Sequence, residues 1–140
     1  MYEHVVESAK MASLKDLRVL IVDDSDTTRR ILGTIVRSRE WTVCGEAENG
    51  WTGVKKFNEL MPDLVLLDFA MPDINGIEVA TWMSASNPTV PIIMFTILNL
   101  DGFERAARNA GICAVVFKGE CWTLLKSIET AVAQSQRSIQ

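Results

Sequence analysis

Four short apolar segments of this chain each run directly into a residue that can take part in phosphate chemistry. The segments and the residues that follow them are 19–22 before Asp23 and Asp24, 64–67 before Asp68, 92–95 before Thr96, and 114–117 before Lys118. Short continuous apolar runs separated by helical patterns are typical of parallel strands buried on both faces, and ligands bind such open sheets at the carboxyl ends of the strands. We therefore expect three carboxylates, a hydroxyl and an ammonium group to meet in one crevice.

The three carboxylates predict a cation site. At separations of about 4 to 6 Å they would repel one another by about 1 to 4 kcal/mol per pair. A hard divalent cation offsets this repulsion, and Mg²⁺ characteristically uses one or two carboxylates, retained waters and a substrate phosphate. A single aspartate at a strand end would more often face solvent. Three at the ends of two strands, with Thr96 and Lys118 at the ends of two more, favour a site that binds metal and phosphate.

Length, charge and cysteine content bound the class of protein. With 140 residues, 48% of them hydrophobic, the chain has room for one domain with a sizeable core. The net charge of −4 gives no field for binding a polyanion, so direct contact with nucleic acid is not expected. No apolar run is long enough for a bilayer and no secretory signal is present, which predicts a cytoplasmic protein without membrane contact. The odd number of cysteines without ligand spacing indicates buried thiols in a reducing compartment.

Helical patterns alternate with the apolar runs. They are a helix capped by Ser25 or Asp26 with Ile31, Leu32, Ile35 and Val36 on one face, a helix with Trp51, Val54, Phe57 and Leu60 that stops before Pro62, a helix over 77–85, a helix from about Leu100 to Ala110 ended by Gly111, and a helix with Leu124, Leu125, Ile128 and Val132. Residues 41–47 alternate better than the other runs, which suits a strand nearer a sheet edge, and Asn49-Gly50 is expected to form a turn.

Five strands alternating with five helices predict an α/β fold. Right-handed crossovers place helices on both faces of one parallel sheet, so a doubly wound five-stranded domain follows. The domain is expected over residues 16–133, after a flexible leader at 1–15 and before a polar tail or the start of a linker at 134–140.

Together these residues resemble a known family over about Leu17 to Ala133. The matching motifs are the acidic pair Asp23-Asp24, the stretch from Asp68 to Gly76 that reads Asp-Phe-Ala-Met-Pro-Asp-Ile-Asn-Gly, Thr96, and Phe117-Lys118. In this order and spacing the set is similar to the receiver domain of two-component response regulators. The resemblance implies a flavodoxin-like fold with strand order 2-1-3-4-5. It also implies an aspartyl-phosphate switch, not an enzyme, that is phosphorylated by a histidine kinase or a phosphotransfer protein.

The resemblance also implies a role for each residue of the site. Asp68 would be the phosphoacceptor, and a carboxylate at a strand end can attack an in-line phosphoryl group. The ligands of Mg²⁺ or Mn²⁺ would be Asp23, Asp24, Asp68 and the backbone carbonyl of Ala70. Lys118 would pair with the phosphoryl oxygens and Thr96 would hydrogen-bond one of them.

The same resemblance implies how the signal leaves the domain. Thr96 and Phe117 would form the switch, with Phe117 turning into the space that the Thr96 hydroxyl vacates. The fourth helix, fifth strand and fifth helix would form the output surface. Such surfaces often pair in this family, so a homodimer that forms on phosphorylation is expected.

The chain departs from the family pattern at two positions. Gly119 follows the lysine where proline in a cis bond is common, and Ile97 stands where a small residue is usual. The bulk of Ile97 is expected to crowd the approach to Asp68. The first departure, together with the Asn75–Ala80 stretch, looks most like receivers that precede a LuxR-type helix-turn-helix.

Two alternatives remain open from the residues alone. Asp24-Ser25-Asp26-Thr27-Thr28 fits the D-x-D-x-T motif of haloacid-dehalogenase-like phosphatases, with Asp24 as nucleophile and Asp26 as acid. That hypothesis leaves Asp68 unexplained, and it needs a later acidic pair for which only Glu120 and Glu129 are available. The second alternative is a receiver fold that serves only as an interaction module, which the bulk of Ile97 favours and the intact acidic set opposes.

Overall fold

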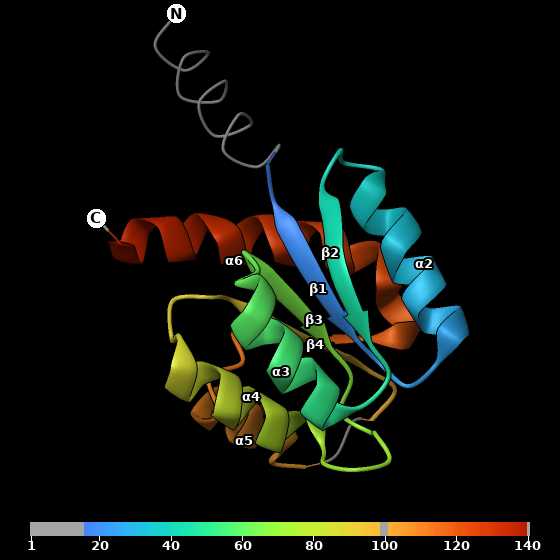
Figure 1. Cartoon of the computed structure of the whole chain (residues 1–140), viewed down its shortest axis with the longest axis vertical. Helices are drawn as coiled ribbons and strands as arrows, with labels where there is room; N and C mark the ends of the chain where they lie inside the picture. The colour runs from blue at the N-terminus through green and yellow to red at the C-terminus, as the bar shows by residue number, and fades with distance from the viewer. Residues whose placement is uncertain (1–15, 99–100, 140) are drawn as a thin grey trace, which may run out of the picture.

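The computed structural model describes residues 16–98 and 101–139 as one parallel sheet with helices on both faces (Figure 1). The strands are β1 (Arg18–Val22), β2 (Thr42–Ala47), β3 (Leu64–Leu67), β4 (Ile92–Thr96) and β5 (Ala114–Phe117), in the sheet order β2-β1-β3-β4-β5. The helices are α2 (Asp26–Arg37), α3 (Gly50–Leu60), α4 (Gly76–Ser86), α5 (Phe103–Asn109) and α6 (Leu124–Ile139), with a 3₁₀ segment η1 (Lys118–Thr123) before α6. The predicted doubly wound, flavodoxin-like fold is confirmed.

Two apolar layers hold the helices to the sheet. Alternate residues of each strand point to opposite faces, so Val19 and Ile21 of β1 enter one layer whereas Leu20 and Val22 enter the other. The first layer packs against α2 and α6, and the second against α3, α4 and α5. The central strands are buried on both faces, which is why β3 and β4 read as unbroken apolar runs.

Side-chain caps set the starts of α2 and α3, and the sequence predicted the first of these caps but not the second. Ser25 caps α2, as expected, by accepting a hydrogen bond from the Thr28 amide at 3.2 Å. The predicted turn at Asn49-Gly50 is wrong, because Asn49 is instead the N-cap of α3 and accepts from the Thr52 amide at 2.9 Å. The α3 helix ends at Leu60, before Pro62 as expected, and Met61 adopts a left-handed φ of 51°.

The last two helices differ from the sequence prediction. The α5 helix begins at Phe103, and the expected start near Leu100 lies outside the described residues. Gly111 follows its C-cap with a φ of 95°, the conformation that glycine adopts most readily. The α6 helix continues to Ile139, past the predicted domain end at residue 133, so residues 134–139 extend a helix where a polar tail was expected. The Ser135 hydroxyl donates to the Thr89 carbonyl at 2.7 Å and ties this extension to the domain.

Other expectations have mixed outcomes. The leader at 1–15 lies outside the described residues. Strand β2 is an edge strand, as predicted. The prediction of buried thiols is wrong for Cys113 and Cys121, which are exposed, while Cys44 is half-buried. Within the described parts of the chain, none of the helices combines the length and apolarity needed to span a bilayer.

Candidate phosphoacceptor and metal site

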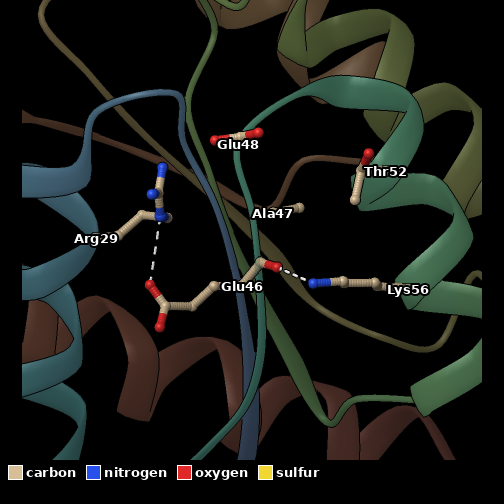
Figure 2. Close-up of a pocket in the computed structure, with 6 residues that line it drawn as sticks. All are labelled: Arg29, Glu46, Ala47, Glu48, Thr52 and Lys56. Carbon is tan, nitrogen blue, oxygen red and sulfur yellow. Dashed lines mark hydrogen bonds and ion pairs between the residues drawn. The ribbon is translucent and has the colours of Figure 1, made fainter.

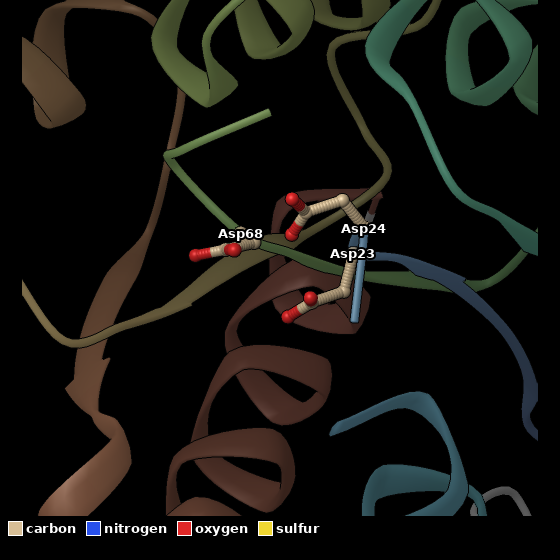
Figure 3. Close-up of side chains that lie close together, drawn as sticks. All are labelled: Asp23, Asp24 and Asp68. Atoms are coloured by element: carbon tan, nitrogen blue, oxygen red, sulfur yellow. The ribbon is translucent and has the colours of Figure 1, made fainter. Parts of the chain in front are cut away.

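Three aspartates meet at the carboxyl edge of the sheet. Asp23 and Asp24 follow β1 and Asp68 follows β3, and these strands pair in parallel so that Val22 lies opposite Leu67. The next residue of each strand therefore enters the same space. One carboxylate oxygen from each of the three side chains lies within 4.8 Å of the others, and the close-up view shows the three gathered at the strand ends (Figure 3). Asp23 and Asp68 are buried and Asp24 is exposed, so the cluster opens to solvent on one side.

The predicted lysine contacts this cluster. Lys118 Nζ lies 3.1 Å from Asp23 Oδ2 and 3.5 Å from Asp68 Oδ2. The sheet brings it there because β5 ends at Phe117, on the far side of β4 from β3. A single ammonium bridging two carboxylates leaves the three-acid cluster with an excess of negative charge.

The two side-chain oxygens of Asp23 differ in their hydrogen bonding. Asp23 is 1% exposed, and its Oδ1 accepts the Ser25 amide at 2.9 Å. Its Oδ2, in contrast, is the buried side-chain oxygen among the described residues that has no hydrogen-bond partner. A buried carboxylate oxygen without a donor is costly unless a charge is close. Lys118 supplies part of that charge, and a hard divalent cation fits the remaining demand, because all three side chains offer oxygen ligands.

The protonation of Asp68 depends on the same neighbours. Burial raises the pKa of Asp68 above its ordinary value, and the nearby Asp23 raises it further. Lys118 and the backbone N–H of Phe69, which donates to Asp68 Oδ1 at 2.8 Å, act in the opposite direction. The net effect is a raised pKa, first because the carboxyl is buried and then because a second carboxylate lies beside it.

The loop after Asp68 is fixed by close backbone contacts. A Cβ atom on Gly76 would lie 2.3 Å from the backbone carbonyl oxygen of Asp68, so only glycine allows α4 to begin this close to the strand end. The Gly76 amide donates to the Phe69 carbonyl at 2.8 Å, and Asn75 caps α4 by accepting from the Glu78 amide at 2.9 Å. These contacts explain physically why asparagine and glycine end the motif.

Asp73 in the same loop caps a different helix. Its two oxygens accept the amides of Gly50 and Trp51 at 2.8 and 2.9 Å, at the start of α3. Slight burial would raise the pKa of Asp73, but the amides of Trp51, Gly50 and Ile74 outweigh it and hold that pKa below its ordinary value. The sequence shows Asp73 only as part of the Asp68–Gly76 motif, because its function as a cap depends on a contact across 23 residues.

The remaining predicted residues lie where the strand order puts them. Thr96 is fully buried, and its hydroxyl accepts the Leu98 amide at 3.3 Å. Phe117 is half-buried. Ala70 is exposed in the loop after Asp68. Ile97 is 75% exposed, so its side chain is largely in solvent.

Asp26, the proposed acid of the phosphatase alternative, does not join the cluster. Its side chain is 81% exposed on the first turn of α2, where it pairs with Arg29. The family match of the chain also points away from a phosphatase, so this alternative is not supported. Arg29 itself was missed at the sequence level, although its spacing of three from Asp26 on a helix marks the two as neighbours.

The fold and the acidic edge define a doubly wound domain that gathers three carboxylates and a lysine at the carboxyl ends of its strands. The family model for the response regulator receiver domain matches residues 19–129. The chain therefore belongs to the response regulator receiver domain family, the phosphoacceptor module of two-component signalling. By itself it is a receiver, although receivers also occur as parts of enzymes.

Several relatives and solved structures resemble the chain. It is 38% identical to the chemotaxis protein CheY of Listeria monocytogenes over 95 residues, which cover 68% of this chain and 80% of that protein. It is 34% identical to the response regulator GacA of Pseudomonas viridiflava over 74% of this chain but 49% of that protein. The response regulator domain of Thermotoga maritima CheB superposes with a TM-score of 0.78 at 30% identity, covering 84% of this chain and 97% of that one. A LuxR-family response regulator from Aurantimonas gives a TM-score of 0.81 at 26% identity, covering 85% and 86%.

Proposed function

We propose that Asp68 is the phosphoacceptor of this receiver. The observation that carries the proposal is the cluster of Asp23, Asp24 and Asp68 within 4.8 Å, with Lys118 Nζ at 3.1 and 3.5 Å from two of them. Asp68 follows the central strand β3 and lies between the other two carboxylates and the lysine in the order of the sheet. An oxygen of Asp68 attacks the phosphorus of a phosphohistidine, the P–N bond breaks, and an acyl phosphate forms.

The other residues of the site neutralise charge around this transfer. Asp23 and Asp24, with Asp68 and the backbone carbonyl of Ala70, would hold Mg²⁺ or Mn²⁺, and the ion would offset the charge of the phosphoryl oxygens. Lys118 moves from its carboxylate partners to the incoming phosphoryl oxygens as a compact point charge. The Thr96 hydroxyl donates a hydrogen bond to one of these oxygens.

The signal leaves through the far edge of the sheet. Phe117 turns inward when Thr96 is drawn toward the phosphoryl group, and this changes the surface of α5, β5 and α6. The partner that supplies the phosphoryl group is a histidine kinase or phosphotransfer protein, and a homodimer through this surface is the expected assembly of the phosphorylated form. A solved structure of the CheX-CheY-BeF3-Mg²⁺ complex from Borrelia burgdorferi, to which this chain is 25% identical with a TM-score of 0.72, supports a site of this type.

Intact-mass analysis tests the assignment. With Mg²⁺ and acetyl phosphate, the protein should gain one acid-labile phosphoryl group, and Asp68→Asn should gain none while remaining folded. Label on Asp24 would instead support the phosphatase mechanism.

Thermal unfolding tests the metal site separately. Binding of Mg²⁺ at roughly tenfold its Kd stabilises the fold by about 1.4 kcal/mol, so the melting temperature should rise with Mg²⁺. A melting temperature that does not change in millimolar Mg²⁺ would refute the metal site.

A further inference from the structure

Arg29 of α2 is a mostly buried arginine that contacts the backbone of Asp23 in the acidic site. Its side chain is 13% exposed. Nη1 donates to the backbone carbonyl of Asp23 at 2.6 Å, and Nη2 donates to the Asp26 carboxylate. Nε lies 3.4 Å from Oε1 of Glu46 on β2. The three nitrogens of one rigid guanidinium thus engage three different points of the chain.

Glu46 anchors Arg29 to β2. Its carboxylate faces Arg29 while its backbone carbonyl accepts Lys56 Nζ at 2.5 Å, so β2 is joined to α2 on one side and to α3 on the other (Figure 2). These groups line an open hollow of about 330 Å³ beside the β1–α2 loop. Both cations of the hollow are already engaged with Glu46, so we do not assign it an anionic ligand.

The backbone carbonyl oxygen of Asp23, which Arg29 holds, lies between the two carboxylates of the acidic pair along the chain. The carbonyl of Asp23 belongs to the peptide group that joins Asp23 to Asp24, and that group is planar. The amide of Asp23 donates to the Ala47 carbonyl at 3.0 Å, so β2 holds Asp23 directly through Ala47 and indirectly through Glu46 and Arg29. Fixing this peptide plane restricts the directions in which both carboxylates leave the backbone.

We propose that Arg29 is a positioning residue, which holds the Asp23-Asp24 peptide so that the two carboxylates are in place before a cation binds. The proposal rests on the proposed function only in taking Mg²⁺ as the cation of this cluster. Arg29 does not contact the cation or the phosphoryl group. It acts on both aspartates through the peptide that they share, which is the kind of outer contact that tunes metal sites.

The direction in which Mg²⁺ affinity changes when Arg29 is replaced distinguishes a positioning role from a purely electrostatic one. A positive charge beside the cluster repels a cation, so loss of the Arg29 charge alone should tighten Mg²⁺ binding. Loss of the contact to Asp23 should weaken it. Arg30 provides a matched control, because it carries the same charge one residue along the helix and is exposed.

Isothermal titration of the metal-free protein with Mg²⁺ tests the proposal. Arg29→Ala should weaken the Kd by about tenfold or more, the range found when outer contacts of metal ligands are lost. Arg29→Lys should fall between Arg29→Ala and wild type, because one ammonium can replace only part of the fork. Arg30→Ala should bind Mg²⁺ as tightly as wild type or more tightly. Without metal, amide exchange at Asp24 and Ser25 should be faster in Arg29→Ala than in Arg30→Ala.

Two results would overturn the proposal: Mg²⁺ binding in Arg29→Ala that equals or exceeds that of Arg30→Ala, or equal amide exchange in the two. If the wild type bound no Mg²⁺, the proposed metal site would fail, and amide exchange alone would decide whether Arg29 holds the loop. If Arg29→Ala did not fold, Glu46→Gln would replace it, since it removes the anchor charge and leaves the arginine. A smaller but measurable loss of Mg²⁺ affinity is then expected, and no loss would contradict the proposal.

Discussion

Thr96 and Phe117 are direct partners across β4 and β5, and each is the last residue of its strand. Partners in a parallel ladder project to the same face, and alternation from Met94 and Val115 puts both side chains on the face that α3, α4 and α5 cover. Thr96 is fully buried whereas Phe117 is only half-buried. In the proposed switch, an inward movement of the threonine would therefore vacate space beside the Phe117 side chain.

This arrangement predicts that Thr96→Val separates phosphorylation from switching. The variant keeps the volume of the side chain but loses the hydroxyl, so Asp68 should still be phosphorylated while the Phe117 ring no longer changes its environment. Ring NMR signals of Phe117, with and without beryllofluoride, measure this. Thr42→Val on the exposed edge of β2 is the control and should respond like wild type. A full shift of the Phe117 signals in Thr96→Val would contradict the proposed switch.

The sequence predicted the strands well because their burial left a simple signal. Residues 64–67 and 92–96 are buried at every position, so each appears as an unbroken apolar run that ends at a functional residue. The parallel order then brings Asp23, Asp68 and Lys118 to one edge without any knowledge of loops. The features that follow from parallel strands alone, namely the strand positions and the residues at their carboxyl ends, could therefore be predicted from the sequence.

Contacts between loops and distant elements could not be predicted in this way. Asp73 caps α3 from a different loop, and Arg29 reaches Glu46 across the edge of the sheet. Neither contact has a periodic signature, because both depend on how helices lie over the sheet. The Asn49-Gly50 turn was mispredicted for the same reason, since the α3 helix begins where Asp73 and Asn49 together satisfy its first amides.

The metal-free protein should become less stable as pH rises, because of Asp68. Burial and Asp23 raise the pKa of Asp68 in the folded protein, so the fold binds this proton more readily than the unfolded chain does. The favourable contribution is complete below the ordinary carboxylate pKa of about 4 and is lost as pH rises through the raised pKa. In EDTA at pH 7, Asp68→Asn should therefore be more stable than wild type.

Denaturation in EDTA between pH 4 and 8 measures this difference, which should shrink toward pH 4. Asp101→Asn, at an exposed position, should track the wild type at every pH. With saturating Mg²⁺ the order should reverse, because the wild type keeps all three carboxylates. A variant less stable than wild type in EDTA at pH 7 would show that the loss of the Lys118 contact outweighs the relieved repulsion.

Gly76→Ala should damage both the fold and the site. The new Cβ would lie 2.3 Å from the Asp68 carbonyl oxygen and 2.9 Å from the Cα of Phe69, so the backbone that carries the phosphoacceptor must move. We expect a loss of about 1 to 3 kcal/mol in unfolding free energy, typical of overpacking, and slower phosphorylation by acetyl phosphate. Gly119→Ala is the matched control, since its Cβ would meet nothing within 4 Å. Equal stability of the two variants would refute the role assigned to Gly76.

The phosphorylated form should be long-lived for a receiver. Hydrolysis needs a water aligned with the bond between Asp68 and phosphorus, and aligning it takes a polar side chain at the mouth of the site. The flanking positions that could supply one hold Ala70 and Leu98, and neither side chain can hydrogen-bond a water. Ala70→Asn or Leu98→Gln should therefore speed the decay of phosphoprotein after the donor is removed, as followed by mass or labelled phosphate.

Ile97 adds a second, separable effect on the same kinetics. It follows Thr96 at the end of β4 and is 75% exposed, so we expect its bulk to hinder an arriving donor more than a water already at the carboxylate. Ile97→Ala should hasten phosphorylation by acetyl phosphate more than it hastens decay, and Ile31→Ala, at a half-exposed site on α2, should change neither rate. Decay of the wild type within seconds would refute the role of Ala70 and Leu98. Unchanged rates in Ile97→Ala would refute the role of Ile97, while leaving Asp68 as the phosphoacceptor.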